Sequence, residues 1–516
     1  MAEWWRNAVL YEIYVRSFAD GNGDGLGDLP GVRARLPYLR DLGVDGIWLT
    51  PFYPSPDADH GYDVTDYVDV DPRFGTLEDF DALLADAHDL GLRVLIDIVP
   101  NHTSDQHPWF RNALADPSSR DRARYLFRPG RDGGPPNNWT SAFGGSAWEL
   151  DEASGEYFLH MFAPEQPDLD WHNPDVEESF AEILRFWLDR GVDGFRIDVA
   201  QALYKDNTLT DTHEPERRTW HADWVTHVNQ PDLLPLYARW RRLAGEYEGD
   251  RMFVGEIVLL DQDAVAQYVT PDRLQLAFNF TLLHSEWDAE AMRATIEATR
   301  VALEAVGAPP TWVLENHDVV RLPTRYGGGA EGVRRARAAA LLVLALPGTV
   351  FVYEGQELGL EEVYVPEELR QDPIFFRTNG TRPGRDGCRV PIPWESDPPG
   401  FGFTDGTPWL RIPDDWTEKS VARQTGDRAS TLEQYRAALA ARRSIPALRS
   451  GSFAWLDVAP GVLAFERREG DEAVACVVNV DADPVALPDG ELLVASDPEV
   501  SGTLPRAAAA WVRLRM

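Results

Sequence analysis

The chain has 516 residues, of which 44% are hydrophobic and 11% aromatic, so it is too long for one ordinary domain and can bury several packed cores. Its net charge of −36 and isoelectric point near 4.6 argue against nucleic acid and anionic membranes as partners, because both need a basic surface. Lysine occurs only at positions 205 and 419, and we interpret the excess of arginine as coding bias.

Cysteine usage and the N-terminus bear on location. Cys388 and Cys476 are the only cysteines, too few for a disulfide framework, and they favour a reducing compartment. The first residues lack the basic segment and apolar run of a secretion signal. The longest apolar stretch, Ala338–Leu346, is too short to cross a membrane. We therefore expect a cytoplasmic protein with no membrane partner.

Short apolar strands alternate with helical patterns through most of the chain. The expected strands are Val9–Val15, Gly46–Leu49, Arg93–Ile98, Gly194–Ile197, Met252–Val254, Leu274–Phe278, Thr311–Leu314 and Val350–Tyr353. Helices are expected between them, for example over Leu77–Leu90, Val176–Arg190 and Val333–Leu346. This alternation predicts an α/β fold, a parallel (β/α)8 TIM barrel. An open doubly wound sheet is the second interpretation, but no glycine-rich dinucleotide fingerprint follows the first strand.

Two insertions and a change of pattern predict the domain organisation. The stretch 103–171 is rich in Gly, Pro, Asn and Trp, which favours a small domain inserted after strand 3 over a structureless loop. A second insertion, 361–416, is expected at the barrel rim. Short alternating strands after residue 447 predict a C-terminal antiparallel β-sandwich. The predicted domains are a barrel (1–102 and 172–446), an inserted domain (103–171) and a sandwich (447–516).

Four strand ends carry chemically reactive side chains. They are the segments Asp97–His102, Gly194–Asp198, Val254–Glu256 and Glu315–Asp318. Carboxyl ends of barrel strands meet at one mouth, so we expect their side chains to share a site. Paired carboxylates in a pocket are what glycoside cleavage requires, since one attacks carbon and the other transfers the proton.

Each of these residues has an expected role. Arg196 leaves the same strand face as Asp198 and should keep that carboxylate ionised, as a nucleophile must be. Apolar neighbours of Glu256 favour a carboxyl group that keeps its proton, as an acid catalyst needs. Asp318 could accept hydrogen bonds from sugar hydroxyls, and His102 and His317 could donate hydrogen bonds to the same ring. Read singly, each of these residues also fits an ordinary structural role.

A separate motif, Asp20-Gly-Asn-Gly-Asp-Gly-Leu-Gly-Asp28, places oxygen ligands at alternate positions around glycine turns, which suits a hard cation. Position 12 of an EF-hand would be Gly31, so the bidentate Glu is missing. We expect a structural Ca²⁺ or Mg²⁺ site; its ligands would be Asp20, Asn22, Asp24, the Leu26 carbonyl and Asp28. The alternative is a polar Asp/Gly turn. No organic cofactor is expected.

Together these segments resemble glycoside hydrolase family 13, the α-amylase superfamily, over nearly the whole chain. Three further motifs point to its α-glucosidase and oligo-1,6-glucosidase branch: Gln166-Pro-Asp-Leu-Asp-Trp171, His60-Gly-Tyr-Asp63 and Gly384-Arg-Asp-Gly-Cys-Arg389. The resemblance implies that Asp198 is the nucleophile, Glu256 the acid/base and Asp318 the transition-state stabiliser. It further implies that one glucose unit is bound by Tyr62, Asp63, His102, Arg196, His317 and Arg385, and that a cation occupies the Asp20–Asp28 loop.

Some positions depart from the family pattern. Asp170 stands where Asn is common, and Val390-Pro-Ile-Pro-Trp394 stands where Thr-Pro-Met-x-Trp is usual. Val199 follows the implied nucleophile; in part of the branch Val accompanies α-1,6 cleavage and Thr accompanies α-1,4 cleavage, but exceptions leave the linkage open.

The resemblance implies a retaining exo-α-glucosidase that acts on short gluco-oligosaccharides through a covalent glucosyl-enzyme, with transglucosylation as a further outcome. It would work as a monomer or homodimer. One alternative is a glucosyl isomerase of the trehalose synthase type. Another is a catalytically silent accessory or binding protein on the same fold, against which the intact Asp198, Glu256 and Asp318 count.

Overall fold

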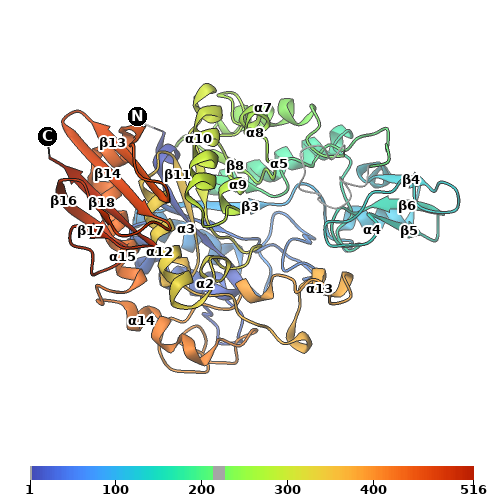
Figure 1. Cartoon of the computed structure of the whole chain (residues 1–516). Coiled ribbons are helices and arrows are strands. Elements are labelled where there is room, and N and C mark those ends of the chain that lie inside the picture. Colours follow the sequence, from blue (N-terminus) through green and yellow to red (C-terminus); the bar gives the residue numbers. More distant parts are fainter. Residues whose placement is uncertain (1–2, 213–226, 516) are drawn as a thin grey trace.

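A computed structural model describes residues 3–212 and 227–515. Residues 1–2 and 213–226 of the expected barrel ranges, and residue 516 of the expected sandwich, lie outside the described residues. Figure 1 shows the barrel at the centre of the molecule, with a small sheet at one end and a larger sheet at the other.

In the described part of the chain, eight parallel strands curl into a nearly closed barrel. They are β1 (Val9–Ile13), β2 (Gly46–Leu49), β3 (Arg93–Ile98), β7 (Gly194–Ile197), β8 (Met252–Gly255), β9 (Leu276–Ala277), β10 (Thr311–Val313) and β11 (Thr349–Tyr353). Their order is β10-β11-β1-β2-β3-β7-β8-β9. Across the remaining gap between β9 and β10, the Asn279 amide donates a hydrogen bond to the Thr311 carbonyl. The predicted TIM barrel is confirmed.

The strand predictions differ from the structure only at the ends of strands. β1 stops at Ile13 because Val15 already begins the short helix α1 (Val15–Phe18). β9 retains only Leu276–Ala277 of the expected Leu274–Phe278, because its ladder with β8 contains just these two residues.

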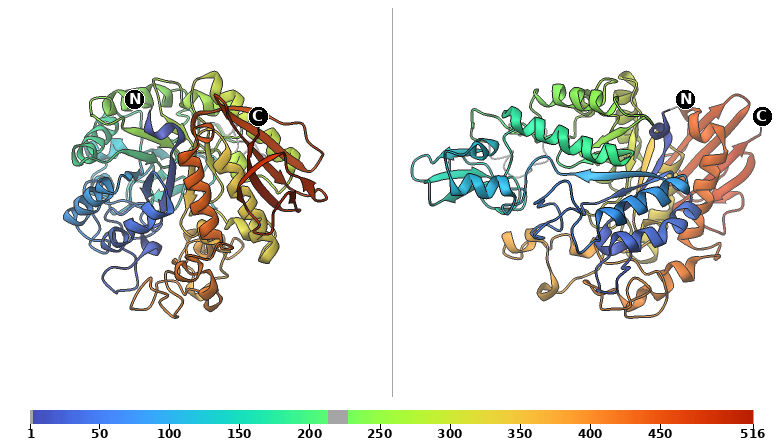
Figure 2. Two further views of the ribbon diagram at one scale, coloured as in Figure 1. Left: turned by 90° about the vertical axis from the view of Figure 1, so that its left-hand side faces the viewer. Right: turned by 180° about the vertical axis from the view of Figure 1, so that it is seen from behind.

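Helices follow the strands and cover the outside of the barrel (Figure 2). The longer ones are α2 (Leu29–Leu42), α3 (Leu77–Asp89), α5 (Pro174–Arg190), α7 (Leu233–Ala244), α8 (Gln262–Tyr268), α10 (Ala289–Ala305), α12 (Gly329–Ala345) and α15 (Thr431–Ser444). Local chemistry sets their ends: Thr76 and Asp79 form a capping box on α3, and Gly191 ends α5 with a positive φ of 103° that favours glycine.

Short helical segments fill the connections and the rim. They are η1 (Trp4–Asn7), α9 (Phe280–Leu283), α11 (Leu322–Arg325), η3 (Gln356–Leu358), η4 (Glu367–Leu369), α13 (Pro373–Arg377), η5 (Asp386–Cys388), η6 (Asp414–Lys419), α14 (Val421–Gln424) and α16 (Pro446–Ser450).

The stretch after β3 forms the small sheet at one end of the barrel (Figure 1). It contains α4 (Pro108–Ala115), η2 (Arg120–Arg124), β4 (Phe127–Pro129), β5 (Trp148–Asp151) and β6 (Glu156–Leu159), with antiparallel order β4-β6-β5. Its core contains Trp139, Phe143, Trp148 and also Ile374 from α13. The rim after the eighth barrel strand therefore packs against the inserted segment.

The C-terminal sheet is antiparallel and contains β12 (Ser452–Trp455), β13 (Val462–Glu469), β14 (Glu472–Asn479), β18 (Ala508–Leu514) and β16 (Gly490–Ala495) in that order. A second, two-stranded sheet pairs β15 (Val485–Ala486) with β17 (Thr503–Leu504). Alternation along β18 explains the layers: Ala509 and Trp511 join the main core, whereas Ala508 and Ala510 join a separate small core. The predicted C-terminal β unit is confirmed.

Both cysteines are buried and free. Among residues 3–212 and 227–515, none of the helices is long and apolar enough for a membrane span.

Candidate active site

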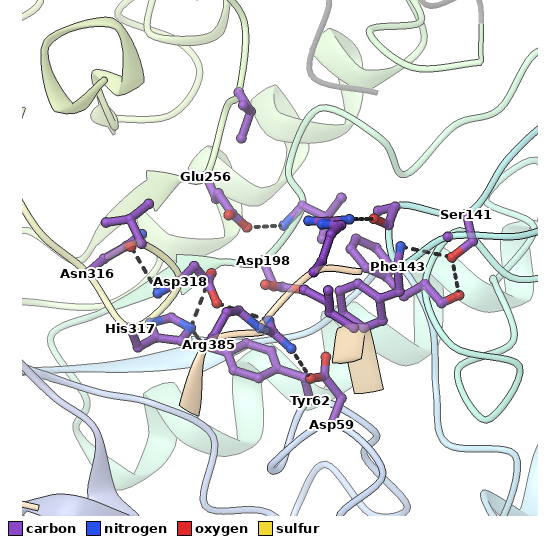
Figure 3. A pocket seen from close by; sticks show the side chains of 18 of the residues that line it. Asp59, Tyr62, Ser141, Phe143, Asp198, Glu256, Asn316, His317, Asp318 and Arg385 are labelled. Carbon is purple, nitrogen blue, oxygen red and sulfur yellow. Dashed lines mark hydrogen bonds and ion pairs between the residues drawn. The ribbon is translucent and has the colours of Figure 1, made fainter. Parts of the chain in front are cut away.

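Three carboxylates from separate strand ends line one cavity of about 670 Å³, a size within the usual range for small-molecule sites. Asp198 follows β7, Glu256 follows β8, and Asp318 lies beyond β10. Figure 3 shows their side chains pointing into this space. The parallel barrel brings them together because all its strands end at the same mouth.

Arg196 lies behind the cavity and connects its carboxylates. Its guanidinium is 1% exposed. Nη1 donates to Asp97 at 3.0 Å and to Asp198 at 2.7 Å, and Nη2 lies 2.9 Å from Glu256 Oε2. Burial lowers the pKa of Arg196, but Asp97, Glu256 and Asp198 outweigh burial and hold it well above its usual value. One permanent cation therefore contacts three carboxylates.

The charge of this cluster is unbalanced. Burial raises the pKa of Asp198 well above its usual value, Arg196 lowers it, and Glu256 and Asp97 raise it further. Burial also raises the pKa of Asp97 to about 7, against the opposing effect of Arg196. The expected effect of Arg196 on Asp198 is present, but burial outweighs it. Three carboxylates around one guanidinium thus favour retention of a proton in the cluster.

Asp318 has the opposite electrostatic environment. Arg385 Nη1 and Arg389 Nη2 donate to its Oδ1 at 3.0 and 2.9 Å, and His317 Nε2 lies 3.4 Å from Oδ2. Burial alone would raise the pKa of Asp318, but His317 and the two guanidinium groups hold it well below its usual range. Asp318 is therefore a permanent anion on the cavity wall.

Tyr62 and His317 form a stacked pair on the same wall. Their rings lie 5.4 Å apart with an interplanar angle of 7°. Tyr62 Oη contacts Asp97 at 3.0 Å and His317 Nε2 at 2.8 Å, and the fully buried Glu12 contacts His317 Nδ1 at 2.5 Å. Burial lowers the pKa of His317 to about 3, so the ring is neutral at physiological pH. Glu12 on β1 was not predicted, because nothing in its local sequence distinguishes it from a strand residue.

The structure places Asp59, and not Asp63, at the cavity. Asp63 is fully buried behind the wall, where it accepts hydrogen bonds from Ser55 Oγ at 2.8 Å and from the amides of Ala58 and Asp59. Asp59 lines the cavity and lies 2.6 Å from Arg385 Nη2. Asp59 directly precedes the His60–Asp63 motif, so only the folded turn shows which of the two aspartates reaches the cavity. The other predicted residues on the cavity wall are Tyr62, His102, His317 and Arg385.

The outer part of the cavity is formed by residues that the sequence motifs did not identify. They are Thr140–Gly145 and Phe162 of the inserted segment, Val258, Phe280 and His284, Val319, and Ile374, Thr378 and Arg382 of the rim. The Arg385 guanidinium lies 4.9 Å above the Phe143 ring. Many of these side chains are apolar, in contrast to the charged strand ends.

The predicted cation loop is folded on itself. Asp20 Oδ1 accepts from the amides of Asn22 and Gly23 at 3.0 and 2.7 Å, and Asp24 Oδ1 accepts from the Leu26 amide at 2.9 Å. The oxygen ligands suit Ca²⁺ or Mg²⁺ in type. However, the described part of the chain holds no group of three or more His, Cys, Asp or Glu side chains arranged for a metal ion.

Comparison with known proteins identifies a close similarity. The family model "Alpha amylase, catalytic domain" matches residues 12–451. A Rhizobium meliloti protein named "Probable alpha-glucosidase" is 42% identical, over 93% of this chain and 89% of its own length. An oligo-1,6-glucosidase of Parageobacillus thermoglucosidasius is 35% identical, over 92% and 90% respectively.

Solved structures of similar sequence share this fold. An α-glucosyl transfer enzyme is 40% identical with a TM-score of 0.91 and covers 100% of both chains. A mutant isomaltulose synthase from Erwinia rhapontici NX5, solved with its natural substrate sucrose, is 32% identical with a TM-score of 0.91, and the match covers 99% of each chain.

Proposed function

This chain belongs to the α-amylase family and is a glycoside hydrolase, and we propose that it is a retaining exo-α-glucosidase that removes terminal glucose from short oligosaccharides. The observation that carries this proposal is the convergence of Asp198, Glu256 and Asp318 on one cavity, with a single buried guanidinium bonded to the first two.

In the proposed mechanism, Asp198 attacks the anomeric carbon while Glu256 protonates the leaving oxygen. A covalent glucosyl-enzyme forms, and Glu256 then accepts a proton from the water that hydrolyses it. Such retention requires the two carboxyl groups to lie about 5–5.5 Å apart. Their contacts with the same Arg196 guanidinium support close spacing.

Asp318 would complete the electrostatic arrangement. An oxocarbenium-like transition state carries positive charge on the sugar ring, which a fixed anion stabilises. Asp318 remains ionised beside Arg385, Arg389 and His317. It therefore needs no proton loss at the moment of reaction.

The exo mode is supported by the Asp59–Arg385 ion pair. These side chains come from the loop after β2 and from the rim, and their contact at 2.6 Å closes one part of the cavity wall. Arg385 is further held by Asp372 at 2.6 Å. A closed wall beyond one glucose unit admits chain ends and excludes the middle of a chain.

The nucleophile assignment is tested by Asp198→Ala. We expect the hydrolysis of a chromogenic α-glucoside to fall by roughly 10⁴-fold or more, because the covalent step is lost. Asp206→Ala, which changes a partly exposed carboxylate outside the cavity wall, is the control. Near wild-type hydrolysis by Asp198→Ala would refute the assignment, whereas an absence of hydrolysis by the wild type itself would favour the accessory-protein alternative.

A glucosyl isomerase remains the second candidate, because the similar solved structures include an isomaltulose synthase. Such an enzyme would return glucose to its partner before water enters. Incubation with maltose, isomaltose, sucrose and trehalose separates the two functions. Free glucose from maltose or isomaltose supports hydrolysis, whereas trehalose from maltose or an isomeric disaccharide from sucrose supports isomerisation. The same analysis detects transglucosylation as longer products.

We also propose that the Asp20–Asp28 loop binds a structural Ca²⁺ or Mg²⁺ through Asp20, Asn22, Asp24, the Leu26 carbonyl and Asp28. Binding to the folded state would raise the midpoint of thermal unfolding when the metal-free protein receives millimolar Ca²⁺. Asp24→Asn should remove this rise. An unchanged midpoint in both proteins would rule out a site of useful affinity. Monomer or homodimer assembly and a cytoplasmic location stay predictions.

A further inference from the structure

Lys205 is a buried cation close to the site that the mechanism does not use. It is 3% exposed and is one of two lysines among 49 basic residues. It is absent from the cavity wall, so it does not touch a bound sugar directly. An ammonium group in the interior requires a specific set of partners, since its desolvation is costly.

The three N–H donors of Lys205 have three acceptors. Nζ lies 2.8 Å from Asp168 Oδ2 and donates to Asn101 Oδ1 and to the Ala202 carbonyl, both at 2.5 Å. An ammonium group donates hydrogen bonds and cannot accept them. The atom of the Asn101 amide that faces Lys205 must therefore be the oxygen, which fixes the orientation of that amide.

The orientation of Asn101 determines which nitrogen of His102 carries the proton. Asn101 Nδ2 has two protons, and it lies 3.1 Å from Asp168 Oδ2 and 3.1 Å from His102 Nδ1. Nδ1 must accept from this amide, so the proton of the neutral ring resides on Nε2. Nε2 lies 3.1 Å from the Tyr62 carbonyl, which can only accept.

One contact of Nε2 opposes this arrangement and two favour it. The Gln166 amide nitrogen, a donor that also donates to Asp59 Oδ2 at 3.2 Å, lies 3.1 Å from His102 Nε2. The Asn101 amide at Nδ1 and the Tyr62 carbonyl at Nε2 both require the proton on Nε2. Tyr62, Asp59 and His102 line the cavity, whereas Asn101 and Asp168 do not. The protonated edge of the imidazole therefore belongs to the cavity side, and its acceptor edge faces the interior.

We propose that Lys205 is a positioning residue: acting through Asn101, it fixes His102 as the neutral, Nε2-protonated tautomer and so presents a hydrogen-bond donor at the cavity. The role in catalysis rests on the proposed α-glucosidase function, but the tautomer does not. In this tautomer the single Nε2 proton faces the Tyr62 carbonyl, so a sugar hydroxyl would share or compete for that hydrogen bond, and the ring adds no positive charge beside Asp198.

Burial and the charge of Lys205 also favour the neutral form of His102. Burial lowers its pKa to about 4, Asp168 opposes this shift, and Lys205 adds to it. Asp59 acts on the ring only through Gln166. Without the Lys205 cation, the uncompensated Asp168 would raise the pKa of His102. The ring would then become protonated, and activity would fall, at a higher pH than in the wild type.

The decisive variant is Asn101→Asp, because it keeps the size of the side chain and the partner of Lys205 but replaces the Nδ2 donor by an acceptor. The measurement is ¹⁵N NMR of histidine-labelled enzyme, with the His102 signals assigned by their loss in His102→Gln. In the wild type we expect an unprotonated Nδ1 and a protonated Nε2. In Asn101→Asp we expect a protonated Nδ1. A wild-type tautomer in this variant would overturn the proposal.

A second variant, Lys205→Met, should release Asn101 and move the acid limb of the pH profile of kcat/KM to higher pH. We expect kcat/KM for a chromogenic α-glucoside to fall about tenfold in both variants, since a misdirected donor no longer meets the substrate. Lys419→Met is the matched control: Lys419 pairs with Glu361 away from the cavity, so the tautomer and pH profile should be unchanged.

The two proposals fail in different ways. Should the enzyme not hydrolyse α-glucosides, the NMR comparison still decides the tautomer. An active enzyme whose Asn101→Asp and Lys205→Met variants keep the wild-type pH profile would contradict the positioning role and leave the glucosidase assignment intact. If Lys205→Met does not fold, Asn101→Asp still tests the tautomer, and Lys205→Gln takes its place as the test of the cation.

Discussion

The cavity has two regions with different physical character. Its floor consists of Tyr62 from the loop after β2 and the strand-end side chains Asp198, Glu256, His317 and Asp318, backed by the buried Arg196. Its mouth consists of the outer residues of the inserted segment (140–145), of Val258, Phe280, His284 and Val319, and of the rim residues Ile374, Thr378 and Arg382. Figure 3 shows the floor carboxylates beside Phe143 of the mouth.

The floor is held by charge and the mouth by loop packing. Every floor carboxylate contacts a guanidinium, and these contacts leave little freedom in its position. The mouth contains half-buried apolar side chains such as Val258 and Val319, carried by connections between strands and helices. We infer that the floor determines the reaction and that the mouth selects the leaving group and acceptor. Four comparisons test this division.

The largest expected effect is on the floor. Arg196→Met would leave Asp97, Asp198 and Glu256 without their shared cation in a buried site. We expect the free energy of unfolding at pH 7 to fall by about 3–5 kcal/mol, measured by urea denaturation. The control is Arg120→Met, which removes an exposed pair with Asp175 worth about 1 kcal/mol or less. Equal losses in the two variants would contradict the importance of the floor cation.

The second expected effect is a pH-dependent loss of stability that arises in the inserted segment, on the mouth side of the cavity. Burial lowers the pKa of His160, in the inserted segment, to about 4, below its usual value near 6.5. As pH falls from 6.5 to 4, the unfolded chain gains a proton at this site and the folded chain does not, so stability is lost in this window. His160→Gln should reduce the loss between pH 7 and pH 4 by about 3 kcal/mol, with parallel curves above pH 7. Parallel curves throughout the range would disprove the buried neutral state.

The third comparison separates the two aspartates of the turn after β2. Asp59→Asn should lower kcat/KM for a chromogenic α-glucoside about thirtyfold, because Arg385 loses a charged partner at the cavity wall. Asp63→Asn should mainly lower the thermal unfolding midpoint, because Asp63 holds Ser55 and two backbone amides behind the wall. A greater loss of activity in Asp63→Asn than in Asp59→Asn would reverse the assignment made from the structure.

The smallest effect is on specificity. Val319→Thr changes a half-buried side chain of the mouth without changing its shape greatly. We expect the ratio of kcat/KM for maltose to that for isomaltose to change about fivefold, with little change in the thermal midpoint. An unchanged ratio, with or without an equal loss of kcat/KM on both sugars, would contradict a role of Val319 in specificity.

Much of the fold and of the floor could be predicted from local sequence patterns. Arg93–Ile98 and Gly194–Ile197 read as short buried strands between helical patterns, and the structure begins and ends them at the same residues. The expected nucleophile, acid/base and stabiliser positions all lie on one cavity, because each directly follows a strand or lies just beyond one. The local pattern did not distinguish Asp59 from Asp63, since only the turn geometry directs one of them to the cavity.

The amino-acid sequence by itself determined the barrel, the order of its strands and the acidic and basic side chains at their ends, because hydrophobic periodicity and strand-end position are local properties. Only the tertiary structure decided which carboxylates share Arg196, that Glu12 supports His317, and that Lys205 orients Asn101 beside His102. Except for Arg196 with Asp198, these contacts join residues far apart in the chain. Proton positions and charge balance in them depend on burial, which arises only when the whole barrel has closed.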